Sequence, residues 1–192
     1  MYAELLGDAR VYELLQRIDE ELATQARAAG CACGGRLHSA RYPRKPRGGP
    51  HGLSAQYEHR LSYCCAQDGC RKRTTPPSVR FLGRKVYLGA VVVLVSALRQ
   101  GPTPTRVSVL HELFGVGART LRRWRQWWRR TFATSAFWRA ARARFLPPLT
   151  AGDLPDGVVQ RFAAQTADGL CRLLRFLSPI TTGSCALVHG GV

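Results

Sequence analysis

Acidic residues are scarce in this sequence, and no apolar run is long enough to cross a membrane. The 192 residues include 12 Asp and Glu against 29 Lys and Arg, so the formal net charge is +17. The longest apolar run, residues 86–98, has 13 residues, whereas a transmembrane helix needs about 17–25. The N-terminus also lacks the basic region and apolar run of a secretion signal. We therefore expect a cytoplasmic protein that has polyanionic partners and does not bind membranes.

Motifs of known catalytic centres are missing as well. The chain has no Gly-x-x-x-x-Gly-Lys loop for nucleotides and no His-x-His pair for a nicking site. Residues 131–192 offer only Asp153, Asp156 and Asp168, in a short helical context that does not suit a two-metal carboxylate site. We therefore expect no enzymatic activity. The alternative is a nuclease or transposition enzyme that uses these scattered acids or the histidines of the cysteine-rich segment.

The positive charge is concentrated in the middle of the chain. Residues 1–30 contain six acidic and three basic residues, whereas residues 31–146 contain 23 basic and three acidic residues. Nearly all of these cations are arginine, whose planar guanidinium suits paired hydrogen bonds to phosphate and guanine. A GC-rich coding sequence can explain part of the arginine bias but not the net charge. The middle of the chain is therefore the predicted nucleic-acid contact.

Apolar periodicity predicts a mainly α-helical fold with a small zinc-ribbon-like β region. In chain order we expect an N-terminal amphipathic helix (1–30), a zinc-ribbon-like domain (31–80), a trihelical helix-turn-helix domain (81–146), a C-terminal helical segment (147–178) and a disordered tail (179–192). The first helix has apolar residues on one side, namely Val11, Leu14, Leu15, Ile18 and Leu22. Its charged residues, Asp19 among them, fall on the other side, and Gly30 ends it.

Two short helices are expected in the C-terminal segment, at about 155–164 and 167–177, with Asp153 and Thr166 as their N-caps. The second has leucines at three- and four-residue spacings: Leu170, Leu173, Leu174 and Leu177. This apolar face can either bring two copies of the chain together or pack back on the same chain.

Five of the seven cysteines lie between residues 31 and 70. Because the sequence shows no export signal, we do not expect these cysteines to form disulfides. One pair, Cys31 and Cys33, precedes two glycines; the other, Cys65 and Cys70, spans a turn that contains Gly69. Two close pairs of soft ligands on tight turns are the usual arrangement of a structural Zn²⁺ site. We therefore predict that these four cysteines bind Zn²⁺. The alternative is a group of buried thiols.

Cys64 and Cys65 are adjacent, so the strand pattern must decide which of them binds the metal. If residues 61–65 form a strand, Cys65 shares a face with Leu61 and Tyr63, while Cys64 lies on the other face. Cys65 also gives the shorter spacing to Cys70. We choose Cys65 and retain as substitutes Cys64 and three histidines, His38, His51 and His59.

Such a metal site would position two basic segments. One directly follows the last cysteine, and the other, residues 41–49, is called here the basic strip. Prolines and glycines favour an extended backbone in the strip, which can follow a groove or a phosphate chain. The alternative is a solvated flexible loop. The predicted DNA contacts in these segments are Arg44, Lys45, Arg47, Arg71, Lys72 and Arg73.

Residues 105–130 have the pattern of a helix-turn-helix. Apolar residues recur at helical spacing on both sides of a Gly-containing turn; they are Val107, Leu110, Leu113 and Phe114, then Leu121, Trp124 and Trp128. Six arginines fall within residues 119–130 with no acidic residue among them, so this charged surface repels itself unless an anion binds. The alternative is an ordinary amphipathic helix with a charged side.

The second helix of this pattern is the predicted recognition helix for double-stranded DNA. Its contacts are Arg119, Thr120, Arg122, Arg123, Arg125, Gln126, Arg129 and Arg130. Residues near its start reach base edges and the later arginines meet phosphates. Trp127 either packs on a neighbouring helix or stacks on a sugar or base. Residues 84–100 supply the first helix of the unit, with Gly101 after it, although their valines also suit a strand.

The segments CACGG, CCAQDGCRKRTTPPS and ELFGVGARTLRRWRQWW together resemble the zinc-ribbon plus helix-turn-helix region of many bacterial insertion-sequence transposases and related orphan or accessory proteins. The resemblance covers residues 31–130 and implies recognition of element-end DNA through residues 119–130, with the four cysteines holding the ribbon. The catalytic carboxylate domain of such transposases has no counterpart in the pattern of residues 131–192. The resemblance therefore supports binding and not strand transfer.

These expectations combine into one functional prediction. We expect a nucleoid-associated DNA-binding protein of mobile-element origin, with an accessory or regulatory role, that acts as a homo-oligomer or beside a transposase subunit. The same positive charge is also compatible with an RNA-binding or ribosome-associated protein, which is the alternative.

Overall fold

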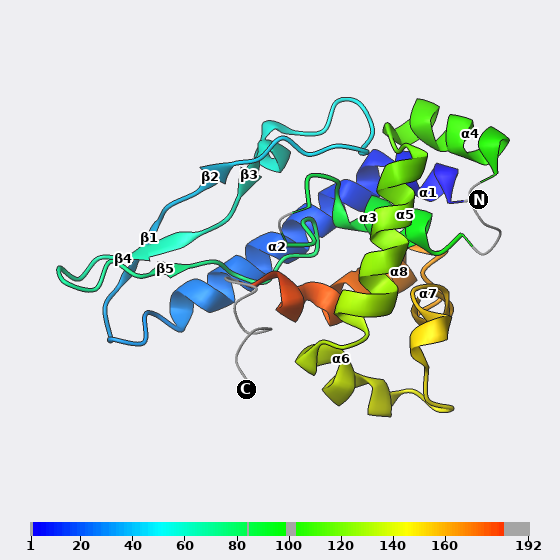
Figure 1. Ribbon diagram of the computed structural model, residues 1–192. Helices are drawn as coiled ribbons and strands as arrows, with labels where there is room; N and C mark the ends of the chain where they lie inside the picture. Colours follow the sequence, from blue (N-terminus) through cyan, green and yellow to red (C-terminus); the bar gives the residue numbers. More distant parts are fainter. Residues whose placement is uncertain (1, 84, 99–102, 183–192) are drawn as a thin grey trace.

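The computed structural model describes residues 2–83, 85–98 and 103–182. The fold is mainly helical with a small antiparallel sheet at one end (Figure 1), as the periodicity predicted. Within the described residues, no helix combines the length and the apolar character needed to cross a membrane. The expected helix end at Gly101 lies outside the described residues, as do residues 183–192 of the expected tail.

The N-terminal region forms two helices where one was expected. Helices α1 (Ala3–Gly7) and α2 (Ala9–Ala28) are separated by Asp8, which has an extended backbone at φ −81° and ψ 109°. The Asp8 carboxylate accepts a hydrogen bond from the Arg10 N–H at 3.0 Å, so Asp8 acts as the N-cap that starts α2.

The apolar side of α2 differs in part from the prediction. Val11, Leu15 and Ile18 are buried, but Leu14 is 38% exposed. Asp19, expected among the charged exposed residues, is buried instead. The buried side of α2 is therefore centred nearer to Tyr12 and Asp19 than the apolar pattern indicated.

A three-stranded antiparallel sheet contains β1 (Leu37–Ser39), β4 (Tyr63–Cys65) and β5 (Arg73–Thr74) in the order β1-β4-β5. A second pair joins β2 (Tyr42–Pro43) to β3 (His59–Arg60), which follows the short 3₁₀ turn η1 (Ala55–Glu58). One side of the larger sheet packs near the end of α2 in a small apolar cluster of Ala23, Cys31, Leu37, Leu61, Tyr63 and Cys65. This cluster lies apart from the main core.

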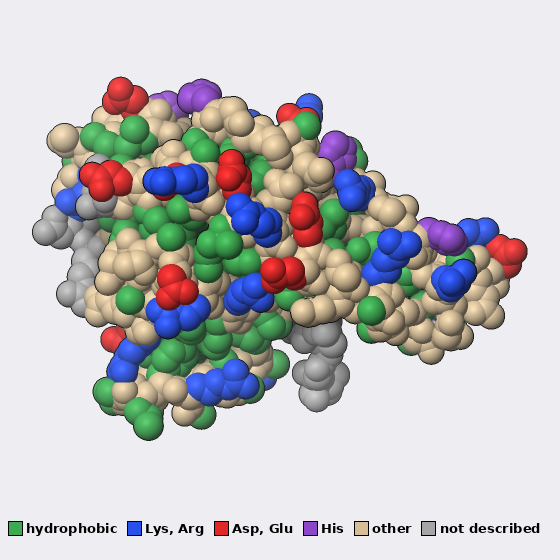
Figure 2. Space-filling model, turned by 180° about the vertical axis from the view of Figure 1, so that it is seen from behind, with side chains coloured by type: hydrophobic (Ala, Val, Ile, Leu, Met, Phe, Trp, Pro, Cys, Tyr) green, Lys and Arg blue, Asp and Glu red, His purple; other side chains and the backbone are tan. Residues whose placement is uncertain are grey.

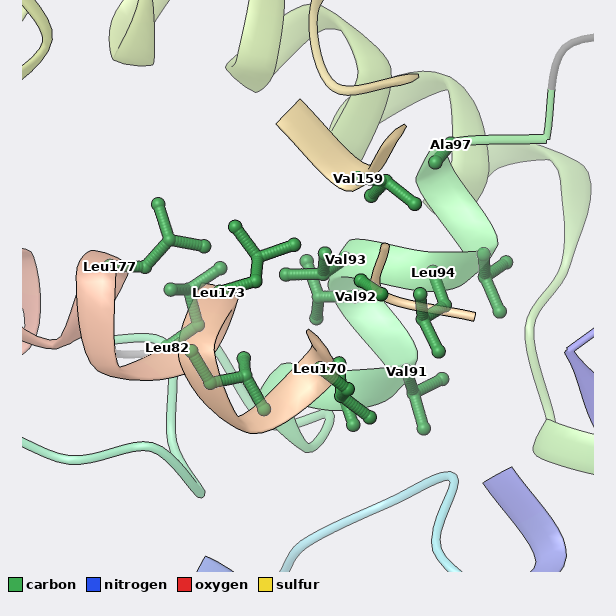
Figure 3. Packing of buried hydrophobic residues seen from close by; sticks show 14 of the residues in the cluster. Leu82, Val91, Val92, Val93, Leu94, Ala97, Val159, Leu170, Leu173 and Leu177 are labelled. Carbon is green, nitrogen blue, oxygen red and sulfur yellow. The ribbon is translucent and has the colours of Figure 1, made fainter. Parts of the chain in front are cut away.

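The remaining helices include one buried helix, α3, which α5, α7 and α8 contact. Their bounds are α3 (Gly89–Ser96), α4 (Pro104–Phe114), α5 (Ala118–Gln126), the π-helical segment η2 (Trp127–Phe132), α6 (Ala136–Ala141), η3 (Arg142–Arg144), η4 (Ala151–Asp153), α7 (Asp156–Arg161), α8 (Ala167–Leu177) and η5 (Ser178–Thr181). All residues of α3 are buried, and leucines of α8 pack against its valines (Figure 3). The run of valines is thus an interior helix and not a strand.

The C-terminal helices pack back on the same chain. Leu170, Leu173, Leu174 and Leu177 are all buried in the main core, so this face of α8 is already covered. Thr166 is the N-cap of α8 as predicted, because its hydroxyl accepts the Gly169 N–H at 3.1 Å. The expected N-cap Asp153 is wrong, since its carboxylate accepts the Thr150 N–H and closes η4 instead.

Residues 179–182, expected in the tail, are folded. Residues 179–181 belong to η5, and the hydroxyl of Thr181 accepts the Ser78 N–H at 2.8 Å inside the protein. The segment up to Thr182 is therefore part of the folded structure.

A buried polar junction joins α2 to the segment after β5. The Asp19 carboxylate accepts hydrogen bonds from the Ser78 hydroxyl at 2.6 Å, the Val79 N–H at 2.6 Å and the Arg80 Nε–H at 2.8 Å. Arg80 also donates to the carbonyl of Gln56 at 3.0 Å. Because both members of the ion pair are almost fully buried, these additional hydrogen bonds are needed to offset their desolvation.

Candidate metal centre and nucleic-acid interface

The four predicted metal ligands lie together. The sulfur atoms of Cys31, Cys33, Cys65 and Cys70 are all within 4.8 Å of one another, with Cys31 to Cys70 at 3.7 Å and Cys33 to Cys65 at 3.5 Å. Tetrahedral coordination with metal–sulfur bonds of about 2.3 Å places sulfur atoms about 3.8 Å apart. The four cysteines, called here the cysteine cluster, can therefore hold a metal ion with little rearrangement.

Backbone amides and glycines shape the cysteine cluster. The Gln67 N–H donates to Cys65 Sγ at 3.4 Å, and Gly34 and Gly69 have φ angles of 82° and 83°, which favour glycine. A Cβ atom on Gly35 would lie 2.6 Å from Cys65 Sγ. Both turns thus need glycine where the sequence has it, because a side chain would either strain the backbone or displace a sulfur atom.

The protonation of the cluster is uneven. A hydrogen bond from the Gly35 backbone, with further ones from the neighbouring thiols, lowers the pKa of Cys33 to about 7. The Gln67 amide lowers the pKa of Cys65, but desolvation and the other sulfur atoms outweigh it and raise the value to about 12. Several negative sulfur atoms at this separation repel one another unless a cation lies between them. The donor set is therefore suited to a soft divalent cation.

The candidate substitutes for a ligand lie outside the cysteine cluster. Cys64 is paired with His38 and Arg73 across the sheet, on the side opposite to Cys65, and its thiol donates to the Arg71 carbonyl at 3.3 Å. His38, His51 and His59 are exposed and are not part of the group. The period-two pattern of the strand thus predicted which of the two adjacent cysteines lies in the cysteine cluster.

Helices α4 and α5 are joined by a tight turn. Gly115 has φ 65° and its N–H bonds to the carbonyls of His111 and Leu110, which ends α4. Leu110, Leu121, Trp124 and Trp128 are buried as predicted. Leu113 was expected in the core but is 48% exposed, so α4 contributes less to the core than its apolar pattern indicated.

The predicted recognition helix carries unpaired cations. Arg119, Arg122, Arg123, Gln126, Arg129 and Arg130 are exposed, while Thr120 and Arg125 are half-buried; we call the six arginines of this group the arginine face. Within the described residues none of these arginines forms an ion pair. Desolvation, followed by repulsion from Arg129, lowers the pKa of Arg125. A bound polyanion would relieve this repulsion.

The α5 helix widens into a π-helical turn where the apolar period changes. In this turn the Ala133 N–H bonds to the carbonyl of Trp128 at 3.1 Å, one residue farther back than in an α-helix. Trp127, which the sequence left undecided, packs edge-on against Trp128 at a centroid distance of 4.9 Å, with the Lys85 ammonium 3.7 Å above its ring. Trp127 therefore already has packing partners within the protein.

The basic strip is extended and anchored rather than loose. The Arg44 N–H bonds to the Glu58 carbonyl, and the Arg47 N–H bonds to the Val86 carbonyl at 3.1 Å. Lys45 and Arg47 are exposed, whereas the half-buried Arg44 side chain donates to the carbonyl of Lys85 at 2.6 Å. Of the three DNA contacts predicted in the strip, Lys45 and Arg47 are thus exposed and can contact a ligand, whereas Arg44 stabilises the fold.

The basic residues after the cysteine cluster are exposed, but two of them already contact other side chains of the protein. Arg71 pairs with the exposed Asp68 at 2.7 Å, and the Arg73 guanidinium lies 5.7 Å from the Tyr42 ring centre. Lys72 is exposed.

On the face of the molecule opposite to that of Figure 1, acidic side chains lie among the basic ones (Figure 2). The arginine face differs from it, because it contains no acidic residue.

Four exposed cations lie outside the predicted DNA contacts. Arg41 lies at the start of the basic strip, and Arg139, Arg142 and Arg144 follow the arginine face on α6 and η3; all four are exposed. The absence of any acidic residue between Glu112 and Asp153 was a signal that could have extended the predicted contact to Arg139, Arg142 and Arg144. A hollow of about 540 Å³ beneath the strip is lined by both Lys45 and Glu58, and its mixed charge does not mark it as an anion site.

Comparisons of this chain with protein-family models, with curated proteins and with solved structures give no match. Functional conclusions therefore depend on the residues and their geometry.

Proposed function

We propose that this protein binds double-stranded DNA through a helix-turn-helix formed by α4 and α5, and that the cysteine cluster holds one Zn²⁺ in a zinc ribbon. The arginine face carries the proposal, because six cations on one helical stretch have no ion-pair partner among the described residues. Arginine at the start of a helix can read guanine, and later arginines can contact phosphates. A role as an accessory or regulatory protein related to mobile-element transposases rests on the sequence resemblance.

The DNA assignment is tested with sequences selected by the protein from a random pool. We expect Arg119→Ala and Arg123→Ala to weaken binding to the selected duplex by about 1–3 kcal/mol and to weaken binding to random duplex less. Arg129→Ala should weaken both alike, because a phosphate contact carries no sequence information. Fluorescence anisotropy at fixed salt measures these affinities.

The matched control for these substitutions is Arg172→Ala. Arg172 is an exposed arginine on α8 that pairs with Asp168 at 2.9 Å, so its removal changes the net charge equally but should leave DNA affinity almost unchanged. If all three α5 variants bound like the control, the recognition helix would be assigned wrongly. Stronger binding to an RNA duplex than to any selected DNA would favour the RNA-binding alternative.

The zinc assignment is tested by measuring metal content. We expect about one Zn²⁺ per chain, lost in Cys65→Ser and Cys70→Ser but retained in Cys64→Ser, because only the Cys64 thiol points away from the cysteine cluster. Atomic absorption on the purified proteins gives the stoichiometry. A Cys70→Ser protein that kept its metal, or a wild-type protein that bound none, would refute the site.

A further inference from the structure

The basic strip presents three of its four cations on one side of an extended backbone. Arg41, Lys45 and Arg47 are exposed, while the residues between them are half-buried or proline, which is the alternation of an extended chain. Arg44 faces inward, where its guanidinium meets the Lys85 carbonyl and lies 5.4 Å from the Phe81 ring centre. The outward-facing cations are therefore Arg41, Lys45 and Arg47. Arg44 faces the opposite way and contacts the rest of the protein.

Residues 85–88 fasten this strip to the start of the recognition helix. The strip is bonded to them on both sides of Arg47, whose N–H donates to the Val86 carbonyl at 3.1 Å and whose carbonyl accepts the Leu88 N–H at 3.0 Å. From the same segment, the Tyr87 ring packs edge-on against Trp124 of α5 at 4.9 Å. The Tyr87 hydroxyl donates to the Gly115 carbonyl, in the turn before α5, at 2.7 Å.

The Arg47 end of the strip is consequently joined to the turn before α5, although the two are far apart in the sequence. In Figure 1 the loop between β2 and β3 ends beside the turn that joins α4 to α5, in agreement with the contacts of Tyr87. Val86, whose carbonyl bonds to Arg47 and which precedes Tyr87 in the joining segment, is 49% exposed. An apolar side chain at such a position can contact a sugar or a thymine methyl group without opposing the surrounding positive charge.

We propose that the basic strip and the arginine face bind one DNA duplex as a single surface, with the strip on the phosphate backbone next to the base pairs that α5 meets. This inference rests on the proposed function and adds the geometry of the contact. An extended basic segment beside a groove-binding helix commonly follows the adjacent groove or backbone. Tyr87 is the positioning residue, because it connects the strip to the turn without itself needing to touch DNA.

The first test introduces a negative charge at the centre of the proposed surface. Val86→Glu is compared with Leu146→Glu, since Leu146 is also an exposed hydrophobic residue, at 80% exposure, and the change in net charge is the same. Binding to a mixed-sequence duplex of about 21 base pairs, two helical turns, is measured by anisotropy. Val86→Glu should weaken binding at least about tenfold more than Leu146→Glu, because a like charge lies against phosphate.

The second test counts phosphate contacts of the strip. In Lys45→Ala/Arg47→Ala, the slope of log affinity against log salt concentration should become shallower by about 1.8, which corresponds to two lost contacts with B-DNA. The same duplex and full-length protein are used. An unchanged slope would overturn the inference.

The third test separates positioning by Tyr87 from a merely structural role. Tyr87→Phe keeps the ring against Trp124 but removes the hydrogen bond to Gly115. If the hydroxyl holds the strip in register, Arg47→Ala should weaken binding by a smaller factor in the Tyr87→Phe background than in the wild type. An equal factor in both backgrounds would overturn the positioning role.

These outcomes are distinguishable from failure of the proposed function. If Arg119→Ala and Arg123→Ala weaken binding while Val86→Glu matches Leu146→Glu, the helix binds DNA and the composite surface is wrong. If none of the arginine-face variants weakens binding, the proposed function itself fails.

Discussion

At the residue scale, the buried carboxylate of Asp19 forms an ion pair that joins α2 to the segment after β5. A charged residue between Ile18 and Glu20 on an amphipathic helix is expected to face water, yet its carboxylate is buried against Arg80, a residue 61 positions later. No residue near Asp19 in the sequence indicates that Arg80 is its partner. By contrast, Cys65 was predictable, because the period-two alternation of a strand is a local property that needs no distant partner.

The Asp19 junction gives a stability prediction. Asp19→Ala leaves the Arg80 cation buried without its counter-charge, so we expect the free energy of unfolding to fall by about 3–5 kcal/mol. Chemical denaturation followed by circular dichroism measures this change.

The control uses another ion-paired acid of the same helix. Glu21 pairs with Arg175 at 2.8 Å, but their side chains are 59% and 45% exposed, so Glu21→Ala should cost at most about 1 kcal/mol. Equal losses in the two variants would show that burial of the Asp19 pair is not what stabilises the junction.

At the element scale, the helices were predictable and their ends were less so. The apolar period located α5 and α8 because each buries one regular stripe, including Trp124 and Leu173. It could not show that α2 begins anew after Asp8, or that the helix after α5 widens into a π-helical turn, since both depend on backbone hydrogen bonds. Leu113 was misassigned because α4 contacts the core mainly through Leu110.

The junction of α7 and α8 gives the prediction at this scale. A Cβ atom on Gly169 would lie 2.1 Å from the Ala163 carbonyl oxygen, so Gly169→Ala forces the turn and the helix apart. We expect a loss of about 1–3 kcal/mol in the free energy of unfolding, again measured by chemical denaturation.

The companion variant in the same turn should act in the opposite direction. Ala163 has φ 50°, a conformation that costs a non-glycine residue about 1–2 kcal/mol, so Ala163→Gly should not destabilise the protein and can stabilise it. A Gly169→Ala protein as stable as the wild type would mean that α8 does not pack against this turn as closely as described.

At the scale of the whole molecule, the polyanionic partner stays a prediction from sequence composition, and composition could not predict the arrangement of the basic segments. The excess of arginine pointed to a polyanion, and the cysteine spacing pointed to a clip that stabilises a segment with little core. What could not be predicted is that Arg47 is joined through Tyr87 to the turn before α5, because these contacts connect positions with no shared local pattern.

Helix α2 has a mechanical consequence at this scale. Its Leu15 and Ile18 belong to the main core, and its Ala23 belongs to the small cluster that includes Cys31 and Cys65. Each residue of an α-helix turns the chain by about 100° and advances it about 1.5 Å. The four-residue interval from Asp19 to Ala23 therefore sets the angle between the two apolar clusters. A single insertion or deletion there would rotate the end that carries the cysteine cluster about the helix axis while leaving all four cysteines in place.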